Sequence, residues 1–246
     1  MRNASGFRAA YEALEQRMKA LADADGDVFL PNPEPQGPAQ YVFVCMEPSL
    51  GRWASDATQA TSKIAAGFRN FLPSDDVALL HYSIRHYLCR PGDGYHITDF
   101  SKGAMLVQRA GPQRVTRYGR WYPLLEEELD LIASADARII AVGNAVSRQL
   151  KRQDFQRPFT SIVHYSSQAV LARRRALIGR EEAFRAFEDS VSREDVIATA
   201  TEVLASAQVP TVIAEETLAQ LRRFQLTLSR QQLMFTYKVA FESLRS

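Results

Sequence analysis

The sequence predicts an α/β protein of three layers, α/β/α, in which helices cover both faces of a mainly parallel central sheet. Short apolar runs, typical of buried strands, alternate with longer segments of helical periodicity. The hydrophobic content of 46% in 246 residues is enough for one sizeable core. From about residue 190 the pattern is purely helical, which predicts a helical C-terminal extension.

The first segments read as helix, linker and strand. Residues 6–23 place apolar side chains three and four positions apart, as an amphipathic helix does. Residues 31–38 are rich in proline, so this segment can be neither a helix nor a central strand. A buried strand is predicted over Tyr41–Met46, and a helix over 56–72.

The middle of the chain continues the alternation. Further strands are predicted over Tyr95–Asp99, over Arg138–Val142 and around Ile162–Val163. Helices are predicted over 122–133 and from about 145 to 150, and Val77–Tyr82 fits either a strand or a short helix.

Two capping patterns and one apolar stripe mark the C-terminal helices. Ser192 with Asp195, and Ser229 with Gln232, resemble capping boxes at helix starts. The stripe consists of Met234, Tyr237, Phe241 and Leu244. It fits core packing or, as an alternative, a surface for a partner.

These patterns divide the chain into an N-terminal helix and linker (1–38), an α/β domain (39–189) and a helical extension (190–246).

Cys45 and Cys89 are too few for a four-thiolate zinc or iron–sulfur site, and the histidines lack metal-ligand spacing. We therefore expect no metal. The charged, helical N-terminal segment and the lack of a long apolar run predict a cytoplasmic protein with no membrane partner.

The formal net charge of +2 does not by itself indicate nucleic acid, but basic residues gather in one region. This cluster comprises Lys151, Arg152, Arg157, Arg173, Arg174, Arg175, Arg180 and Arg185. Such a cluster is usually a solvated face. It flanks a candidate site residue, His164, and that placement favours a nucleic-acid partner.

Two ionisable residues follow apolar runs at predicted strand ends. Glu47 comes after the strand that begins at Tyr41, and His164 comes after Ile162–Val163. In open α/β sheets, ligands bind outside the carboxyl ends of the strands. A carboxylate and an imidazole can stabilise a cation and an anion on one substrate. Glu47 can also be a solvated turn carboxylate, and His164 a satisfied histidine at a strand end.

Four segments, in order, resemble the motifs of the uracil-DNA glycosylase superfamily. They are Cys45-Met46-Glu47-Pro48, Thr98-Asp99-Phe100-Ser101-Lys102, Ile139-Ile140-Ala141-Val142-Gly143 and His164-Tyr165-Ser166. The resemblance covers roughly residues 40–175 and rests on the order and spacing of motifs that are individually weak. It implies the fold of that superfamily and a DNA N-glycosylase activity.

The resemblance also implies roles for the two strand-end residues. Glu47 would stabilise the oxocarbenium-like sugar or orient the attacking water, and His164 would stabilise the departing base anion. The nucleotide would first be flipped out of single-stranded or double-stranded DNA. This chemistry requires neither a metal nor an organic cofactor.

The sequence departs from the family pattern at several positions. Cys45 replaces a glycine, Tyr165 replaces a proline, and the match of Lys102 can be a mere surface residue. Asp99 stands where the family commonly has an asparagine that reads the base edge. An ionised carboxylate only accepts hydrogen bonds, which suits the exocyclic amine of cytosine, and a protonated one can also donate to N3. Asp99 can alternatively cap a turn.

Further residues are assigned by their place near these motifs. Base recognition is expected from Asp99, from the aromatic residues Phe68 and Phe100, and from Ser49. Some relatives carry a blocking tyrosine at the position of Ser49, so the resemblance implies that a serine there would leave room for a 5-substituent. Contacts to DNA are expected from Ser166, Ser167, Gln168, Arg173, Arg174 and Arg175, and Gln168 or Val170–Leu171 could fill the gap left by the flipped base.

The resemblance thus implies a glycosylase that excises a pyrimidine, and Asp99 leads us to expect a modified cytosine of foreign (phage) DNA. One alternative is an ordinary uracil-DNA glycosylase of base-excision repair. A second is a non-catalytic nucleic-acid-binding module on the same fold. A third is a nucleoside or nucleotide hydrolase, for which the sequence has no Gly-rich phosphate loop.

Overall fold

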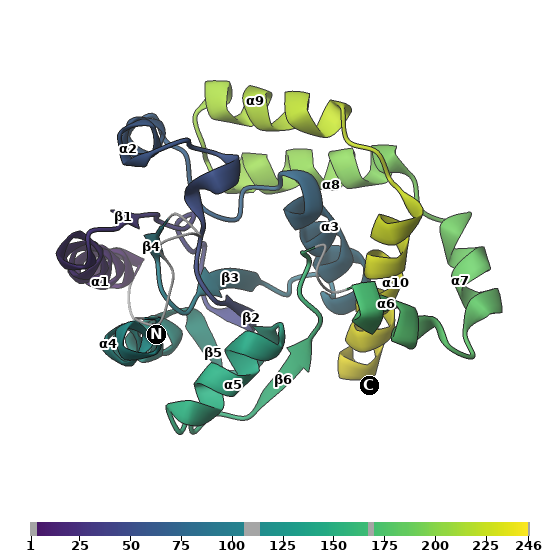
Figure 1. Cartoon of the computed structure of the whole chain (residues 1–246), viewed down its shortest axis with the longest axis horizontal. Helices are drawn as coiled ribbons and strands as arrows, with labels where there is room; N and C mark the ends of the chain where they lie inside the picture. Colours follow the sequence, from purple (N-terminus) through teal and green to yellow (C-terminus); the bar gives the residue numbers. More distant parts are fainter. Residues whose placement is uncertain (1–3, 106–113, 167–169, 246) are drawn as a thin grey trace. The chain divides into compact units, whose positions relative to one another are not determined.

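The computed structural model describes residues 4–105, 114–166 and 170–245 of an α/β protein (Figure 1). Its contacts group the chain into two compact units. Unit 1 comprises Met1–Asn70, Gly94–Ala141 and Ala145–Thr160, and unit 2 comprises Phe71–Asp93, Val142–Asn144 and Ser161–Ser246. The division at residues 38 and 189 expected from the sequence stays a prediction.

A four-stranded sheet has the order β3-β2-β5-β6. Its strands are β2 (Ala39–Cys45), β3 (Tyr95–Asp99), β5 (Ala133–Val142) and β6 (Phe159–Ile162). The central strand β2 is parallel to both β3 and β5, which confirms the predicted mainly parallel sheet. Both faces of β2 are buried, since Val42, Phe43, Val44 and Cys45 are all at most 2% exposed. Burial on both faces explains why this strand is continuously apolar in the sequence.

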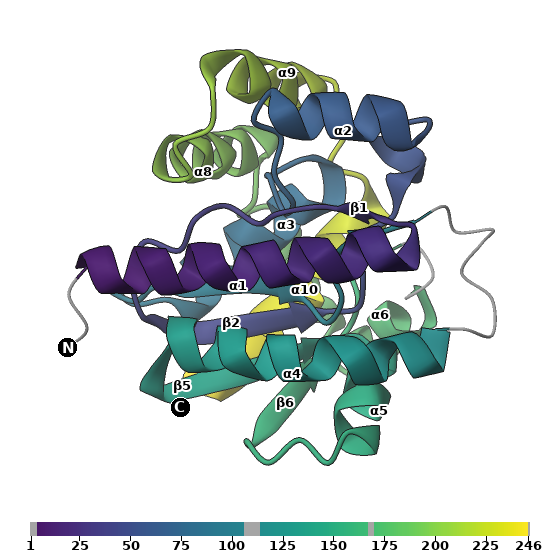
Figure 2. The same cartoon turned by 90° about the vertical axis from the view of Figure 1, so that its left-hand side faces the viewer.

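The helices of unit 1 cover one face of this sheet. They include α1 (Ala4–Asp25), α4 (Arg114–Ile132) and α5 (Asn144–Arg152). Figure 2 shows α1 and α4 side by side along the sheet. Leu14 and Met18 of α1, together with Trp121 and Leu125 of α4, bury Val42 of β2 in one apolar cluster. This cluster is the core that positions the ends of β2 and β3.

Smaller elements complete unit 1. They are β1 (Val28–Phe29) and β4 (Gly103–Ala104), which pair antiparallel, the short helix η1 (Leu50–Arg52), and α2 (Ala57–Ala65). The antiparallel pairing places the proline-rich segment alongside the chain that follows β3, because Leu30 N–H donates to the carbonyl of Lys102 (2.9 Å).

Unit 2 is built almost entirely of helices. They are α3 (Asp75–Ser83), the π-helix η2 (Ile84–Leu88), α6 (Val170–Leu177), α7 (Glu181–Glu188), α8 (Arg193–Ser206), α9 (Thr211–Arg222) and α10 (Leu228–Arg245). Helix α10 contacts α3, η2, α6 and α7, while α8 contacts α3 and α9. Met234, Tyr237 and Phe241 of the predicted apolar stripe are fully buried, which confirms the core interpretation for these three residues.

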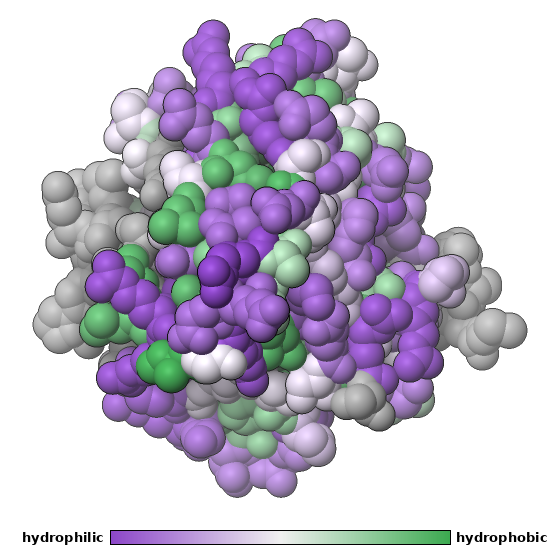
Figure 3. Space-filling model, turned by 90° about the vertical axis from the view of Figure 1, so that its right-hand side faces the viewer, coloured by the Kyte–Doolittle hydropathy of each residue, from purple (hydrophilic) through white to green (hydrophobic). Residues whose placement is uncertain are grey.

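The exposed large hydrophobic side chains of the described residues all belong to unit 2. They are Leu171, Ile178, Val212 and Leu228. On the face drawn in Figure 3, hydrophilic residues predominate and apolar residues form small separate groups. Scattered exposed apolar residues of this kind are normal on protein surfaces, so exposure alone identifies no site.

Several predicted elements change in length or type. Helix α2 ends at Ala65 and not near residue 72, because Gly67 adopts a φ of +101° in the left-handed region. Val77–Tyr82 is helical, within α3. Helix α4 begins at Arg114, well before the predicted start at residue 122, and it continues through Pro123.

One of the two predicted capping boxes is present. Ser192 and Asp195 form a reciprocal capping box at the start of α8. The prediction for Ser229 and Gln232 is wrong, because α10 already begins at Leu228 and the backbone N–H of Gln231 donates to the carbonyl of Thr227. Ser229 instead lies in the first helical turn, where its side chain accepts a hydrogen bond from Arg173.

Candidate functional site

Glu47 lies directly beyond the end of β2, on a loop that β3 continues to support. The backbone N–H of Phe100 donates to the carbonyl of Cys45 (2.8 Å), and that of Ser101 donates to the carbonyl of Met46 (3.0 Å). Parallel pairing therefore extends up to the residue before Glu47. The carboxylate is partly exposed and accepts a hydrogen bond at Oε2 from the Tyr118 hydroxyl of α4. Glu47 is thus held in place and accessible.

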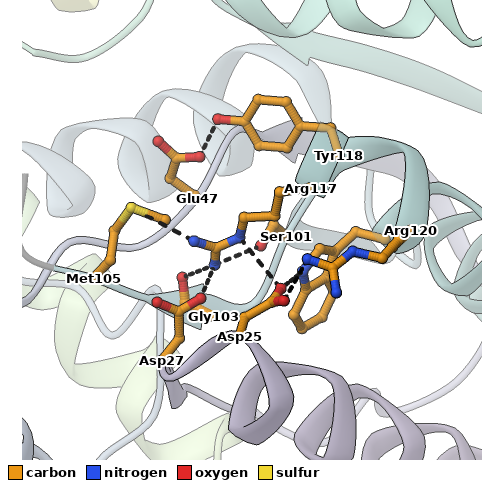
Figure 4. Close-up of polar contacts among 10 residues, drawn as sticks. Asp25, Asp27, Glu47, Ser101, Gly103, Met105, Arg117, Tyr118 and Arg120 are labelled. Carbon is orange, nitrogen blue, oxygen red and sulfur yellow. Dashed lines mark hydrogen bonds and ion pairs between the residues drawn. The ribbon is translucent and has the colours of Figure 1, made fainter. Parts of the chain in front are cut away.

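Buried ion pairs fix the start of α4, and with it Tyr118 (Figure 4). The Arg117 guanidinium donates to the carbonyl of Gly103 (2.8 Å) and lies 2.5 Å from Asp27 Oδ2. Its Nε lies 3.8 Å from Asp25, at the end of α1. A Cβ on residue 103 would displace the Arg117 guanidinium and the Asp27 carboxylate, so glycine permits their close approach to the backbone. This cluster ties three segments of unit 1 together beside Glu47.

Asp99, the last residue of β3, is 3% exposed and pairs in register with Cys45 of β2. Its Oδ2 accepts a hydrogen bond of 2.6 Å from the side-chain amide of Asn70. Burial raises the pKa of Asp99 to about 8, although Lys102 and Asn70 favour the charged form. Glu47 adds to the rise because its negative charge opposes ionisation of a second carboxyl group. At neutral pH Asp99 is therefore mainly a carboxylic acid.

A buried charge pair lies behind the end of β3. Lys102 Nζ contacts Glu128 Oε1 at 2.6 Å, and both side chains are at most 1% exposed. Thr98 Oγ1 accepts from Lys102 (3.0 Å) and donates to Glu128 (2.8 Å). Burial alone would raise the pKa of Glu128, but Lys102 and His96 outweigh it and hold that pKa at about 2. The sequence left open that Lys102 is a mere surface residue. Its burial excludes that interpretation.

His164 belongs to unit 2 and is held as a neutral imidazole of one tautomer. The backbone N–H of Ser166 donates to Nδ1 at 3.0 Å, so Nδ1 is unprotonated and the ring hydrogen lies on Nε2. Burial, and then the charge of Arg173, lower the pKa of His164. The ring stacks on Tyr165, with centroids 4.3 Å apart. Gly143 gives the imidazole room, because a Cβ there would lie 3.1 Å from the His164 Cβ.

The loop that carries His164 is anchored within unit 2. The Tyr237 hydroxyl of α10 donates to the carbonyl of Val163 (3.1 Å). Arg173 of α6, which is 4% exposed, donates to the carbonyls of Tyr165 (3.1 Å) and Ser166 (2.6 Å). Both anchors lie on elements other than the loop itself, so the position of His164 depends on the packing of α6 and α10.

The three arginines of the predicted DNA-binding set differ in their surroundings. Arg173 also donates to Ser229 Oγ (3.0 Å), so its guanidinium is occupied by protein groups. Arg174 and Arg175 are exposed on the same helix, as is Leu171. Ser166 is partly buried beside the His164 ring. Ser167 and Gln168 lie outside the described residues.

The other predicted base-recognition residues are in unit 1. Phe68 is partly buried and stacks on Trp53, with ring centroids 4.8 Å apart. Phe100 is 1% exposed and packs in the core against Tyr118. Ser49 is exposed, and its carbonyl accepts a hydrogen bond from the Trp53 indole (2.8 Å). Phe100 is thus part of the support beneath the site, whereas Ser49 is reachable from solvent.

Unit 1 therefore brings Glu47 and Asp99 to the ends of adjacent strands, and unit 2 carries His164 with its anchors. Sequence reasoning missed Asn70, Tyr118 and Tyr237. No motif identifies Asn70, which lies between helices. Tyr118 and Tyr237 each occupy a helical position that is indistinguishable in sequence from an ordinary core aromatic.

Comparisons with known proteins supply no family for this chain: no family model matches it, and searches of curated proteins and solved structures find no match. Within the described ranges 4–105, 114–166 and 170–245, no group of three or more His, Cys, Asp or Glu side chains could hold a metal ion. None of the helices described there is long and apolar enough to cross a membrane.

Proposed function

We propose that the protein is a DNA glycosylase of the uracil-DNA glycosylase type, with a three-layer α/β/α fold, that excises a cytosine-type base. The observation that supports this most is the placement of Glu47 and Asp99 at the carboxyl ends of adjacent parallel strands. That edge is where α/β sheets bind ligands. Neither side chain has the surroundings of an ordinary solvated carboxylate, since one is held by a tyrosine and the other is buried.

The proposed reaction is hydrolysis of the N-glycosidic bond of a flipped nucleotide. The bond between C1′ and the base nitrogen breaks, and its electron pair leaves with the base. Glu47 stabilises the cationic sugar and orients a water molecule, whose oxygen bonds to C1′ and whose proton passes to the carboxylate. The Nε2–H of neutral His164 donates to O2 of the departing base anion. The Ser166 N–H, by occupying Nδ1, supports this donor role.

Asp99 is assigned to the base edge. As a carboxylic acid it offers one donor and one acceptor, which match N3 and the exocyclic amine of cytosine. The exposed Ser49 is consistent with room for a substituent on C5. A cytosine-directed enzyme would damage its own genome, so the proposed substrate is a modified cytosine of foreign DNA.

DNA contacts are proposed for the exposed face of α6. Arg174 and Arg175 would bind phosphates, and the exposed Leu171 would enter the space left by the flipped base. Arg173 is proposed to act indirectly, by holding the carbonyls of Tyr165 and Ser166.

Uracil is the second candidate base, because a carboxylic acid can also pair with N3–H and O4 if its donor and acceptor are exchanged. Single-turnover excision from otherwise identical oligonucleotides, each containing one uracil, cytosine or 5-substituted cytosine, tests the proposal. We expect excision of cytosine-type bases that is lost in Glu47→Gln. Excision of uracil alone would favour the repair enzyme. No excision of any base, with DNA binding retained, would favour the non-catalytic module.

A further inference from the structure

Asn70 joins two segments of unit 1 at the end of β3. Its backbone N–H donates to the carbonyl of Pro31 (2.8 Å), and its side-chain Nδ2 donates to Asp99 Oδ2 (2.6 Å). Asn70 is partly exposed, whereas Asp99 is buried. Asn70 is thus held through its own backbone, and its side-chain amide contacts the buried carboxyl group.

The contact has a chemical consequence that depends on the protonation of Asp99. An amide NH₂ only donates, so the oxygen that it contacts must accept. A carboxylic acid has one proton, which can lie on either oxygen. With Oδ2 held as an acceptor, that proton lies on Oδ1. The two oxygens then present a donor and an acceptor in one fixed order.

The charged groups around Asp99 are consistent with a retained proton. Glu47 beyond β2 and Glu128 of α4 oppose ionisation, as does burial, while Lys102 after β3 favours it. Because Lys102 is already paired with Glu128, its charge is largely compensated within unit 1. Neutral Asp99 therefore adds no further charge to this interior.

We propose that Asn70 is a specificity-determining residue, which positions the proton of Asp99 on Oδ1 and thereby fixes the order of donor and acceptor that the base meets. Cytosine and uracil present opposite orders at N3 and at the 4-position, so one fixed order accepts one of them and rejects the other. This inference rests on the proposed function insofar as it concerns bases. The placement of the proton is a property of the protein alone.

The titration of Asp99 tests that placement without any substrate. In protein labelled with ¹³C at the aspartate carboxyl carbons, the Asp99 signal is identified by its loss in Asp99→Asn and followed against pH. Asn70→Leu removes a donor that favours the ionised form, so we expect the pKa of Asp99 to rise by about one unit. A fall would mean that the amide accepts the proton from Asp99, and no change would mean that it does not govern the carboxyl group. Either result overturns the inference.

Asn32→Leu is the matched control for this measurement. Asn32 is a buried amide of the same unit, but it donates to Thr98 Oγ1 (3.2 Å). We expect Asn32→Leu to leave the pKa of Asp99 unchanged. An equal shift in both variants would indicate a general disturbance of the interior and would contradict the role of Asn70.

Base discrimination is the second measurement. At pH 7, Asn70→Leu should lower the ratio of cytosine-type to uracil excision at least about tenfold. Without Asn70, the Asp99 proton can lie on either carboxyl oxygen, so the acid can pair with either base. Asp99→Asn should keep the ranking of bases, since Asn70 holds the new carbonyl oxygen and leaves an NH₂ where Oδ1–H stood. The double variant Asp99→Asn/Asn70→Leu should no longer prefer one base over the other. An unchanged ratio in Asn70→Leu would overturn the specificity claim. If wild type excises no base, the proposed function fails, while the titration still decides where the proton lies.

Discussion

At the scale of single residues, the two acidic side chains at the strand ends differ in exposure and in hydrogen-bond partners. Glu47 is partly exposed and accepts a hydrogen bond from a tyrosine hydroxyl. Asp99 is buried next to other carboxylates. Environments that differ in this way are how proteins give two carboxyl groups different roles. The proposed mechanism uses one as an anion and the other as an acid.

Replacing Glu47 tests the anionic role. Glu47→Gln keeps the shape but removes the charge, so we expect DNA binding to persist and the excision rate to fall by about 10²–10⁴-fold. Gel shift measures binding, and alkaline cleavage of the abasic product measures excision. Tyr118→Phe is the matched variant, because it retains Glu47 and removes its donor. It should cost less than Glu47→Gln. Full activity of Glu47→Gln would remove this residue from the mechanism.

Asp99 makes stability depend on pH in a defined direction. Its pKa is about 8 in the folded protein, against an ordinary value of 3.8. Between these values the folded state keeps a proton that the unfolded state has released, so the free energy of unfolding falls as pH rises from about 4 to about 8. Urea unfolding at several pH values should show this decline in wild type and a flatter dependence in Asp99→Asn. Parallel curves would mean that Asp99 is already ionised at neutral pH.

At the scale of elements, α6 carries two kinds of arginine on consecutive positions. Arg173 points into unit 2, where it satisfies carbonyls of the His164 loop, and the next two arginines are exposed. The sequence shows only a run of three identical residues. The direction of each side chain depends on where the helix packs, because neighbouring positions lie about 100° apart around its axis.

Because Arg173 is buried and the next two arginines are exposed, we expect their substitutions to have two separate effects. Arg173→Met should lower the free energy of unfolding by about 1–3 kcal/mol, because it removes the hydrogen bonds that a buried guanidinium donates to the carbonyls of Tyr165 and Ser166. The double variant Arg174→Ala/Arg175→Ala should leave stability within about 0.5 kcal/mol and weaken DNA binding, with a smaller salt dependence. Thermal unfolding and binding at several salt concentrations separate the two effects. An unchanged salt slope in the double variant would place the DNA elsewhere.

At the scale of the whole molecule, the C-terminal helices share a compact unit with segments from the middle of the chain. Helix α10 packs against α3, η2 and α6, and it buries Phe241 and Tyr237 completely. The folding of residues 71–93 therefore depends on residues more than a hundred positions later. A long separation of this kind leaves no local signal in the sequence.

This arrangement predicts coupling between distant segments. Phe241→Ala should destabilise unit 2 by about 3–5 kcal/mol, because it opens a cavity in a fully buried position. Hydrogen exchange should then accelerate in α3 and η2 as well as in α10. Val212→Ala, at an exposed position of α9, is the control and should leave exchange unchanged. Acceleration confined to α10 would show that these helices do not unfold together.

The sequence alone determined the elements whose signals are local. Helix α1 was predicted from its helical periodicity, β2 from its apolar run, and the linker from its prolines. The predicted bounds of β3 agree with the structure at both ends. Glu47 and His164 were singled out because a polar residue after an apolar run indicates a strand end, and Asp99 was singled out by its match to the family motif. The start of α4 and the end of α2 were missed, since helix ends depend on individual turn conformations and on tertiary contacts.

Only the tertiary structure decided the environments of these residues. The protonation of Asp99 depends on burial, on a donor 29 positions away and on carboxylates from other elements. The tautomer of His164 depends on one backbone N–H, and its loop depends on Tyr237 of the last helix. Desolvation and hydrogen-bond geometry arise from the folded arrangement of distant segments. A residue type and its spacing therefore identify which groups are available, and packing decides which chemical form each group takes.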